Sequence, residues 1–557
     1  MPIRFCIPLF VCLLGPFTHV IAQTDLPRLD LATLTLPANW QRSGPVGGGP
    51  DAPGLAPTAG TGVLVGTASV PLSLAMPATD FVLQFDLLTA VGGSASLRLP
   101  NGQLVPLGDG RVGKLPGLWQ TVDLTYQAPA NRRPATLTNL SLNGVMLAEG
   151  RVLAPARESN LPLAMVVQTG SVALRNIGLR SLENRAVANW AGPLTYKLYR
   201  GGAETHDDLA NKTLLKTDTV RAISYDLAYG QPGRATLLFD GKLTTPTAGT
   251  YLFELHTGGV AGLWIDGKPV VPMTYHDLGD PETRAVTLAA GTHDVQVQFA
   301  KSWPRPGLGL FVSQAGTRPQ PLHLAGSIPE VSPASVVAVQ TETRPMLVRS
   351  FIQLPGESRK RTHALSVGNQ SGLHYSLDLN QMALLQVWKG EFADVTQMWY
   401  ERGEPQTLRP MGAVIRPSAR PTLAVLADKN TPWPDSLDDK ILIYKGLLLD
   451  KAGQPTAEYT LGGLAIRDQV NPTSPTALTR TLTVSGNVPG QLYCRLAGAN
   501  VIQALGRGLY ALDDRRYYIR LDPKASATIR QSSGGQELIM PVSTKSGATT
   551  VTYSLEF

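Results

Sequence analysis

The sequence is poor in cysteine and in charge, and each shortage excludes a class of protein. Only 3 of its 557 residues are cysteine, and Cys6 and Cys12 lie in an apolar N-terminal stretch. Cys494 alone follows that stretch, so we expect no disulfide framework. Charged residues make up 16% of the chain, and no Lys/Arg run exceeds Arg359-Lys360-Arg361. Nucleic-acid binders usually gather basic residues on one face, so the net charge of +7 indicates a mildly basic surface and no nucleic-acid partner.

The signatures of cofactor and metal chemistry are missing as well. The chain has no His-Glu-x-x-His pair for zinc, no phosphate-binding P-loop and no Rossmann glycine pattern. Cys-x-x-Cys-His, which attaches a c-type haem, is also missing. We therefore expect no cofactor and no metal site.

Long apolar runs are missing except at the N-terminus. Arg4 precedes the apolar stretch Phe5 to Phe17, and Val20-Ile21-Ala22 matches the small-x-small pattern read by signal peptidase. The stretch is shorter than the roughly 20 residues that cross a bilayer, so we expect a signal peptide over 1–22 and no membrane span. The predicted location is periplasmic, cell-surface or extracellular. An uncleaved N-terminal anchor is the alternative.

What the chain has in abundance is glycine and proline, 55 and 44 residues, which separate short apolar segments. Phe81 to Leu87 alternates apolar and polar positions, as a half-buried strand does. Asn143-Gly144 and Asp266-Gly267 are the residue pairs typical of tight hairpin turns. We therefore predict an all-β fold of three consecutive β-sandwich or jelly-roll domains, over 23–185, 186–312 and 346–557, with a Pro-rich linker over 313–345.

The first predicted domain resembles the 3-keto-disaccharide hydrolase family, which has a concanavalin-like jelly roll. The resemblance rests on Asn39-Trp40, Gly60 to Val65, Asp80 to Asp86, Trp119-Gln120, Leu142 to Val145 and Val172 to Ile177. It implies hydrolase or lyase ancestry. The family's acidic segment is replaced here by Gly92 to Gly102, which has no carboxylate. Glycoside cleavage normally uses two carboxylates, so whether this domain is an enzyme stays open, with Asp86 and Asp123 as candidate catalytic residues.

The second predicted domain resembles the carbohydrate-binding domain named after anthrax protective antigen. The matching residues are Phe239 to Leu243, Pro246, Gly249, Tyr251, Phe253, Leu263 to Gly267, Val270-Val271 and Leu288 to His293. The resemblance implies sugar binding. The lectin members hold calcium with paired aspartates before the Trp-Ile-Asp-Gly strand, where this chain has Thr257 to Gly262, so we expect no calcium. By the same analogy, we expect Trp264 to be a core residue.

The third predicted domain resembles the β-sandwich module that accompanies exported c-type cytochromes and sugar-dehydrogenase-like proteins. The residues that carry the resemblance are Ser366 to Gly368, Gly372 to Asp378, Leu384 to Val395, Met398-Trp399, Arg402-Gly403 and Tyr444 to Gly446. It implies an exported dehydrogenase as a partner.

Candidate sugar-binding residues are aromatic side chains with polar neighbours, because sugar rings stack their C–H faces on indoles. They are Trp303, in a loop, and the cluster Trp388, Trp399, Tyr400, Arg402, Glu391 and Asp394. The cluster forms either a groove wall or, more commonly, core aromatics beside a salt-bridged loop.

His363 and His374 near Asp378 are read as structural histidines, and Asp438-Asp439 and Asp513-Asp514 as solvated turns.

Two hypotheses follow from these observations. The chain is an exported protein that binds or processes carbohydrate, with a glycan as its partner. Alternatively, it is a non-catalytic adhesion or accessory scaffold that partners an exported dehydrogenase.

Overall fold

The computed structural model divides into two compact units, each described here by itself. It describes residues 26–75, 79–129, 134–154, 161–228, 230, 233–276, 278, 281–301, 307–329, 336–399, 406–417, 419–488, 490–543 and 547–557. One unit, which we call the middle unit, joins Met1–Pro27 to Asn184–Glu330, and the other, the split unit, joins Arg28–Glu183 to Val331–Phe557. The predicted signal peptide lies outside the described residues.

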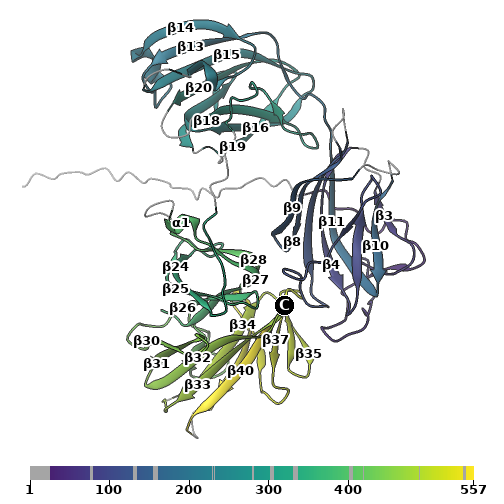
Figure 1. Ribbon diagram of the computed structural model, residues 1–557, viewed down its shortest axis with the longest axis vertical. Coiled ribbons are helices and arrows are strands. Elements are labelled where there is room, and N and C mark those ends of the chain that lie inside the picture. Colours follow the sequence, from purple (N-terminus) through teal and green to yellow (C-terminus); the bar gives the residue numbers. More distant parts are fainter. Residues whose placement is uncertain are drawn as a thin grey trace, which may run out of the picture. The chain divides into compact units, whose positions relative to one another are not determined.

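The middle unit is built of two antiparallel sheets (Figure 1). The larger sheet has the order β14-β13-β15-β20-β17-β18, with β12 beside β15, and the smaller has the order β19-β16-β21-β22. The strands of the larger sheet are β12 (Asn189–Trp190), β13 (Leu194–Arg200), β14 (Thr213–Val220), β15 (Ala235–Thr245), β17 (Gly259–Ile265), β18 (Lys268–His276) and β20 (Gly291–Lys301). Those of the smaller are β16 (Gly249–Thr257), β19 (Glu282–Leu288), β21 (Leu308–Ser313) and β22 (Gln320–Pro321).

The core of the middle unit follows the period-2 pattern of its strands. The apolar residues at alternate positions of β16 and β20 are all buried: Tyr251, Phe253, Leu255, Val295, Val297 and Phe299. The predicted Asp266-Gly267 turn joins β17 to β18, and both residues have the positive φ that such a turn requires, 50° and 71°. Part of the segment 313–345 belongs to this unit, because β22 pairs with β21 and Leu322 lies in the core.

The N-terminal half of the split unit is also a pair of sheets. Their orders are β1-β2-β11-β4-β7-β8-β9 and β3-β10-β5-β6. The strands are β1 (Trp40–Ser43), β2 (Val63–Thr67), β3 (Leu72–Ala75), β4 (Asp80–Thr89), β5 (Ser94–Arg98), β6 (Leu104–Pro106), β7 (Gln120–Gln127), β8 (Thr136–Leu142), β9 (Val145–Val152), β10 (Leu163–Thr169) and β11 (Ser171–Leu182). In β4, Phe81, Leu83, Phe85 and Leu87 are buried, whereas Gln84 and Asp86 are half-buried on the opposite face.

The C-terminal half of the split unit contains three sheets. Their orders are β23-β27-β26-β25-β24 with β28 beside β27, β29-β34-β39-β38, and β30-β31-β32-β33-β40-β37-β36-β35. The strands are β23 (Ala338–Val339), β24 (Met346–Ile352), β25 (Arg361–Gly368), β26 (Leu373–Asp378), β27 (Ala383–Asp394), β28 (Arg409–Ile415), β29 (Leu423–Leu426), β30 (Leu442–Leu449), β31 (Pro455–Leu461), β32 (Leu464–Ser474), β33 (Ala477–Ser485), β34 (Gln491–Ala499), β35 (Ile502–Gly506), β36 (Leu509–Leu512), β37 (Tyr517–Leu521), β38 (Thr528–Ser532), β39 (Gly535–Val542) and β40 (Thr549–Glu556).

A left-handed turn between β36 and β37 joins the two halves of the split unit. Asp513, Asp514 and Arg515 all have positive φ, between 47° and 63°. Arg515 Nη1 donates to Gly48 O at 2.6 Å, and Arg515 O accepts from Trp119 N at 2.9 Å. The Asp513-Asp514 pair, expected as a solvated turn, is therefore part of a contact between sequence-distant segments.

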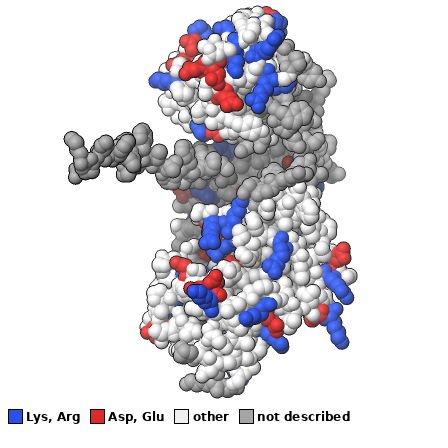
Figure 2. All heavy atoms as spheres, turned by 90° about the vertical axis from the view of Figure 1, so that its left-hand side faces the viewer, with Lys and Arg blue, Asp and Glu red and all other residues white. Residues whose placement is uncertain are grey.

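The all-β prediction is confirmed. Among the described residues, the helical segments are α1 (Thr396–Trp399) and the 3-10 turns η1 (Asp207–Asn211) and η2 (Tyr225–Ala228). None of the helices in this described part is long and apolar enough to cross a membrane. On the face shown in Figure 2, Lys and Arg side chains are interspersed with Asp and Glu.

Candidate functional site

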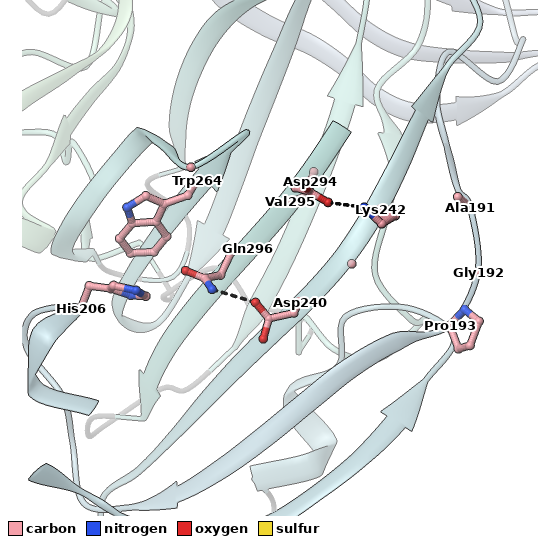
Figure 3. A pocket seen from close by; sticks show the side chains of 12 residues that line it. Ala191, Gly192, Pro193, His206, Asp240, Lys242, Trp264, Asp294, Val295 and Gln296 are labelled. Atoms are coloured by element: carbon pink, nitrogen blue, oxygen red, sulfur yellow. Dashed lines mark hydrogen bonds and ion pairs between the residues drawn. The ribbon is translucent and has the colours of Figure 1, made fainter. Parts of the chain in front are cut away.

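The middle unit has a hollow of about 740 Å³ on the outer face of its larger sheet. Strands β15, β17 and β20 form its floor, and the segments around Gly192 and His206 form its rim. Its polar and aromatic side chains are Trp264, His206, Asp240, Lys242, Asp294 and Gln296 (Figure 3). A concave surface with one aromatic side chain and a few polar groups is the usual form of a small-ligand site.

Trp264 lies in this hollow and not in the core, so the prediction of a core tryptophan was wrong. Its neighbours Leu263 and Ile265 are the buried residues of β17, at 0% and 3% exposure. Successive side chains of a strand point to opposite faces, so the residue between them must point outward. Trp264 is half-buried on that outer face.

The strand register brings the polar side chains of the hollow into two rows. Gln296 of β20 is paired with Trp264 on one side and with Asp240 on the other. Gln296 Nε2 donates to Asp240 Oδ1 at 2.7 Å. In the next row, Lys242 Nζ lies 2.7 Å from Asp294 Oδ1. The first row therefore places an indole, an amide and a carboxylate side by side across three strands.

Two neighbours hold the indole of Trp264 in position. Gly262 lies beneath it, because a Cβ at position 262 would come within 2.7 Å of the indole Cη2. The ring of His206 lies beside it, with 4.7 Å between ring centroids and a tilt of 42°. His206 is itself fixed by a 2.8 Å hydrogen bond between its Nδ1 and Gln298 Oε1. The indole is thus held from two sides.

The turn that ends β17 is fixed by an ion pair. Asp266 Oδ2 lies 2.8 Å from His293 Nδ1, and Asp266 Oδ1 accepts from Asp294 N at 2.9 Å. The hydrogen bond with Asp266 raises the pKa of His293, and the same bond lowers the pKa of Asp266. Across the described residues, no three His, Cys, Asp or Glu side chains gather as a metal site would need.

The candidate catalytic residues Asp86 and Asp123 share the polar face of the larger sheet of the N-terminal half. Gln84 pairs with Asp123 and Thr121 with Asp86, so the two aspartates are diagonal neighbours about 7–8 Å apart at Cα. Asp86 Oδ2 accepts from Arg175 Nε at 3.0 Å, and Arg175 also pairs with Asp514. Asp123 accepts from Gln84 Nε2 at 2.7 Å. Asp86 therefore takes part in the contact that joins the two halves of the split unit.

The predicted aromatic cluster is divided by the structure. Trp388 is 0% exposed and stacks on Phe392 at 5.8 Å between ring centroids, so it is a core residue and unavailable to a sugar. Asp394 Oδ1 accepts from Thr396 N at 2.8 Å at the start of α1. Trp399, at the end of α1, is 73% exposed. Trp303 and Arg402 lie outside the described residues.

His374 is a buried structural histidine, as its sequence context indicated. Its Nε2 lies 3.0 Å from Gly390 O, and its Nδ1 accepts from Asn369 N at 3.1 Å. Burial lowers the pKa of His374 to about 4, so it is neutral in the folded protein at ordinary pH. Asp378 is paired with Arg361 at 3.5 Å. His374 and Asp378 are therefore held by different partners.

The split unit has a second hollow, of about 630 Å³. Met146 and Val145 line it from β9, and Met411 from β28. Lys389 Nζ donates to Gly113 O at 2.9 Å across it, and burial lowers the pKa of this lysine. The groups that line this second hollow do not form a row like that of Trp264, Gln296 and Asp240 in the middle unit.

No family model matches the chain, and no curated protein matches it. Among solved structures, a β-glucosidase from Kluyveromyces marxianus in complex with glucose is 17% identical, with 22% of this chain and 16% of that chain covered and a TM-score of 0.19. The PA14 domain of the antifreeze protein MpAFP is 16% identical over 25% of this chain and 91% of that domain, at 0.21. The GH31 α-xylosidase from Xanthomonas citri is 15% identical over 52% and 31%, also at 0.21. The chain thus spans less than a third of either enzyme, and scores this low do not establish a common fold.

Proposed function

We propose that this protein binds glycans through the hollow of the middle unit, without cleaving them. The observation that carries the proposal is the outward-facing Trp264, whose indole lies against Gly262 in the same row as Gln296 and Asp240. An indole offers the apolar face on which a pyranose ring stacks, and adjacent amide and carboxylate oxygens accept hydrogen bonds from its hydroxyl groups. An exported location, predicted from residues 1–22, is part of the proposal.

Binding is proposed in preference to turnover because of how the candidate acids are used. Asp86 is hydrogen-bonded to Arg175, Thr121 and Asn176, and Asp123 to Gln84 and Ser141. Both sets of contacts lie within the packing of the split unit. These bonds give the two carboxylates a structural function on this sheet.

The test is a glycan array with the full chain, followed by calorimetric titration of the best ligand into the wild type and Trp264→Ala. Loss of an aromatic stacking platform should weaken binding by at least tenfold. Trp399→Ala is the matched control, because it removes an exposed tryptophan from the split unit. Equal affinity of the wild type and Trp264→Ala would refute the proposed binding site. Loss of binding in Trp399→Ala alone would indicate that the glycan binds to the split unit. Release of sugar by the purified protein would refute binding without cleavage.

A further inference from the structure

The hydrogen bonds of the hollow fix which atoms are left for a ligand. A carboxylate only accepts hydrogen bonds, so the Gln296 group that lies 2.7 Å from Asp240 must be the amide nitrogen. Gln296 Oε1 therefore faces the other way, toward the indole of Trp264, as Figure 3 shows. Asp240 also lines the hollow, and among the described residues neither Gln296 Oε1 nor the second oxygen of Asp240 has a hydrogen-bond partner. Both atoms are acceptors.

The tautomer of His206 follows from the same kind of reasoning. Gln298 Nε2 donates to the carbonyl oxygen of Thr205 at 3.0 Å, so Gln298 Oε1 is the atom that faces His206 Nδ1. Oε1 only accepts, and hence Nδ1 carries the proton. In a neutral imidazole the other nitrogen, Nε2, is then an acceptor. His206, Gln296 and Asp240 thus each contribute one acceptor to the hollow that Trp264 lines.

The charges of the hollow do not balance. Lys242 is neutralised by Asp294, at 2.7 Å. Asp240 receives a hydrogen bond from the uncharged Gln296, and within the described part of the chain no cationic side chain is recorded as its ion-pair partner. One carboxylate therefore faces the ligand without a counter-charge. A ligand that supplies N–H or O–H donors and one positive charge complements this arrangement.

We propose, on the basis of the glycan-binding function above, that the hollow selects amino sugars, with the ring stacked on Trp264 and the ammonium group paired with Asp240. The two side chains lie on strands that flank β20, so their Cα atoms are about 10 Å apart. That distance leaves room for one pyranose ring between the indole and the carboxylate. The ligand class is an oligosaccharide that contains unacetylated glucosamine or a stereoisomer of it.

The test compares three β-1,4-linked tetrasaccharides that differ only at carbon 2: tetra-glucosamine, tetra-N-acetylglucosamine and cellotetraose. Each is titrated calorimetrically into the full chain at pH 7 and low salt. A charge-assisted hydrogen bond is expected to make the glucosamine tetramer bind at least about tenfold more tightly than the other two. Asp240→Asn should remove this preference and leave the binding of the neutral sugars in place. Trp264→Ala should weaken all three.

The matched control is Asp218→Asn, which removes an exposed carboxylate from the edge strand β14 of the same unit. It should retain the full preference for the amine. Equal affinity for the three tetramers, with binding still dependent on Trp264, overturns the amino-sugar inference and leaves glycan binding intact. A preference that survives in Asp240→Asn also overturns the inference. Failure of all three sugars to bind overturns both. Melting curves of each variant confirm that it is folded.

Discussion

Arg480 and Asp468 form a fully buried ion pair inside the C-terminal half of the split unit. Arg480 Nε donates to Asp468 Oδ1 at 2.9 Å, and Arg480 Nη2 donates to Asp468 Oδ2 at 2.5 Å. The side chains are 1% and 0% exposed. The remaining guanidinium hydrogens go to Thr422 Oγ1 at 2.8 Å, Met382 O at 2.9 Å and Tyr553 Oη at 3.4 Å. The pair therefore ties the adjacent strands β32 and β33 to segments preceding β27 and β29.

Asp468→Asn is expected to destabilise the split unit by about 3 kcal/mol, because it leaves the charge of Arg480 buried without its counter-ion. Glu458→Gln on the adjacent strand β31 is the control, since it breaks the solvent-exposed pair with Arg467. That change should cost less than about 1 kcal/mol. Urea denaturation of both variants measures the difference. Similar midpoints for the two variants would contradict the prediction.

The stability of the split unit should fall in acid because of His374. Its pKa is about 4 in the folded protein, as a result of burial, against about 6.5 in an unfolded chain. Between these values only the unfolded chain takes up the proton, so stability is full above about pH 6.5 and is lost as the pH falls. The loss attributable to this residue is on the order of 2 kcal/mol between pH 7.5 and pH 5. Denaturation of the wild type and His374→Gln at both pH values isolates the contribution of His374. Equal losses of stability in the two proteins would refute the prediction.

Arg515→Ala should loosen the contact between the two halves of the split unit. Alanine has the same Cβ as arginine, so the left-handed backbone is equally strained in both, and the side-chain hydrogen bonds to Gly48 O and Gly117 O are lost. A buried carbonyl without its donor costs about 1–3 kcal/mol. Hydrogen exchange at the Trp119 amide, bonded to Arg515 O, should accelerate. Arg516→Ala in the same turn removes an exposed guanidinium and should leave that exchange rate unchanged.

Gly262→Ala should reduce glycan binding with little loss of stability. The new Cβ would come within 2.7 Å of Trp264 Cη2 and 3.0 Å of Met273 Sδ, both at the ends of side chains that can move. The indole must therefore shift from its place beside Gln296. Titration with the best glycan should show several-fold weaker binding, and a melting curve should show nearly wild-type unfolding. Unchanged affinity would mean that the position of the indole is unimportant.

Much of the fold was predictable because alternation and turn residues act locally. The inward positions of β4, β16 and β20 and the Asp266-Gly267 turn all follow from residues that are neighbours in sequence. The union of 28–183 with 331–557 was not predictable, because it depends on contacts such as Arg515 with Gly48, which no local pattern records.

The candidate site was missed for a different reason. Trp264 was placed in the core by analogy, although its position between two buried residues already indicated an outward side chain. His206 has no periodic signal because it lies just before a 3-10 turn and outside any strand, and its hydrogen bond with Gln298 joins residues 92 positions apart. Trp388 has charged neighbours in sequence, which left a groove wall and a core position both open, and it is a core residue because β27 is buried on both faces along most of its length.

The docking of Arg515 against Gly48 has a consequence for biogenesis, because 467 positions separate the two residues. A ribosome adds about 5–20 residues per second, so the partner of Gly48 is made roughly 20–90 s after Gly48 itself. During that interval Leu118 of the N-terminal half, which packs into the core of the C-terminal half, lacks its permanent cover, while the strands of residues 184–330 are already available for folding. A holdase chaperone that shields Leu118 should therefore raise the yield of correctly assembled protein.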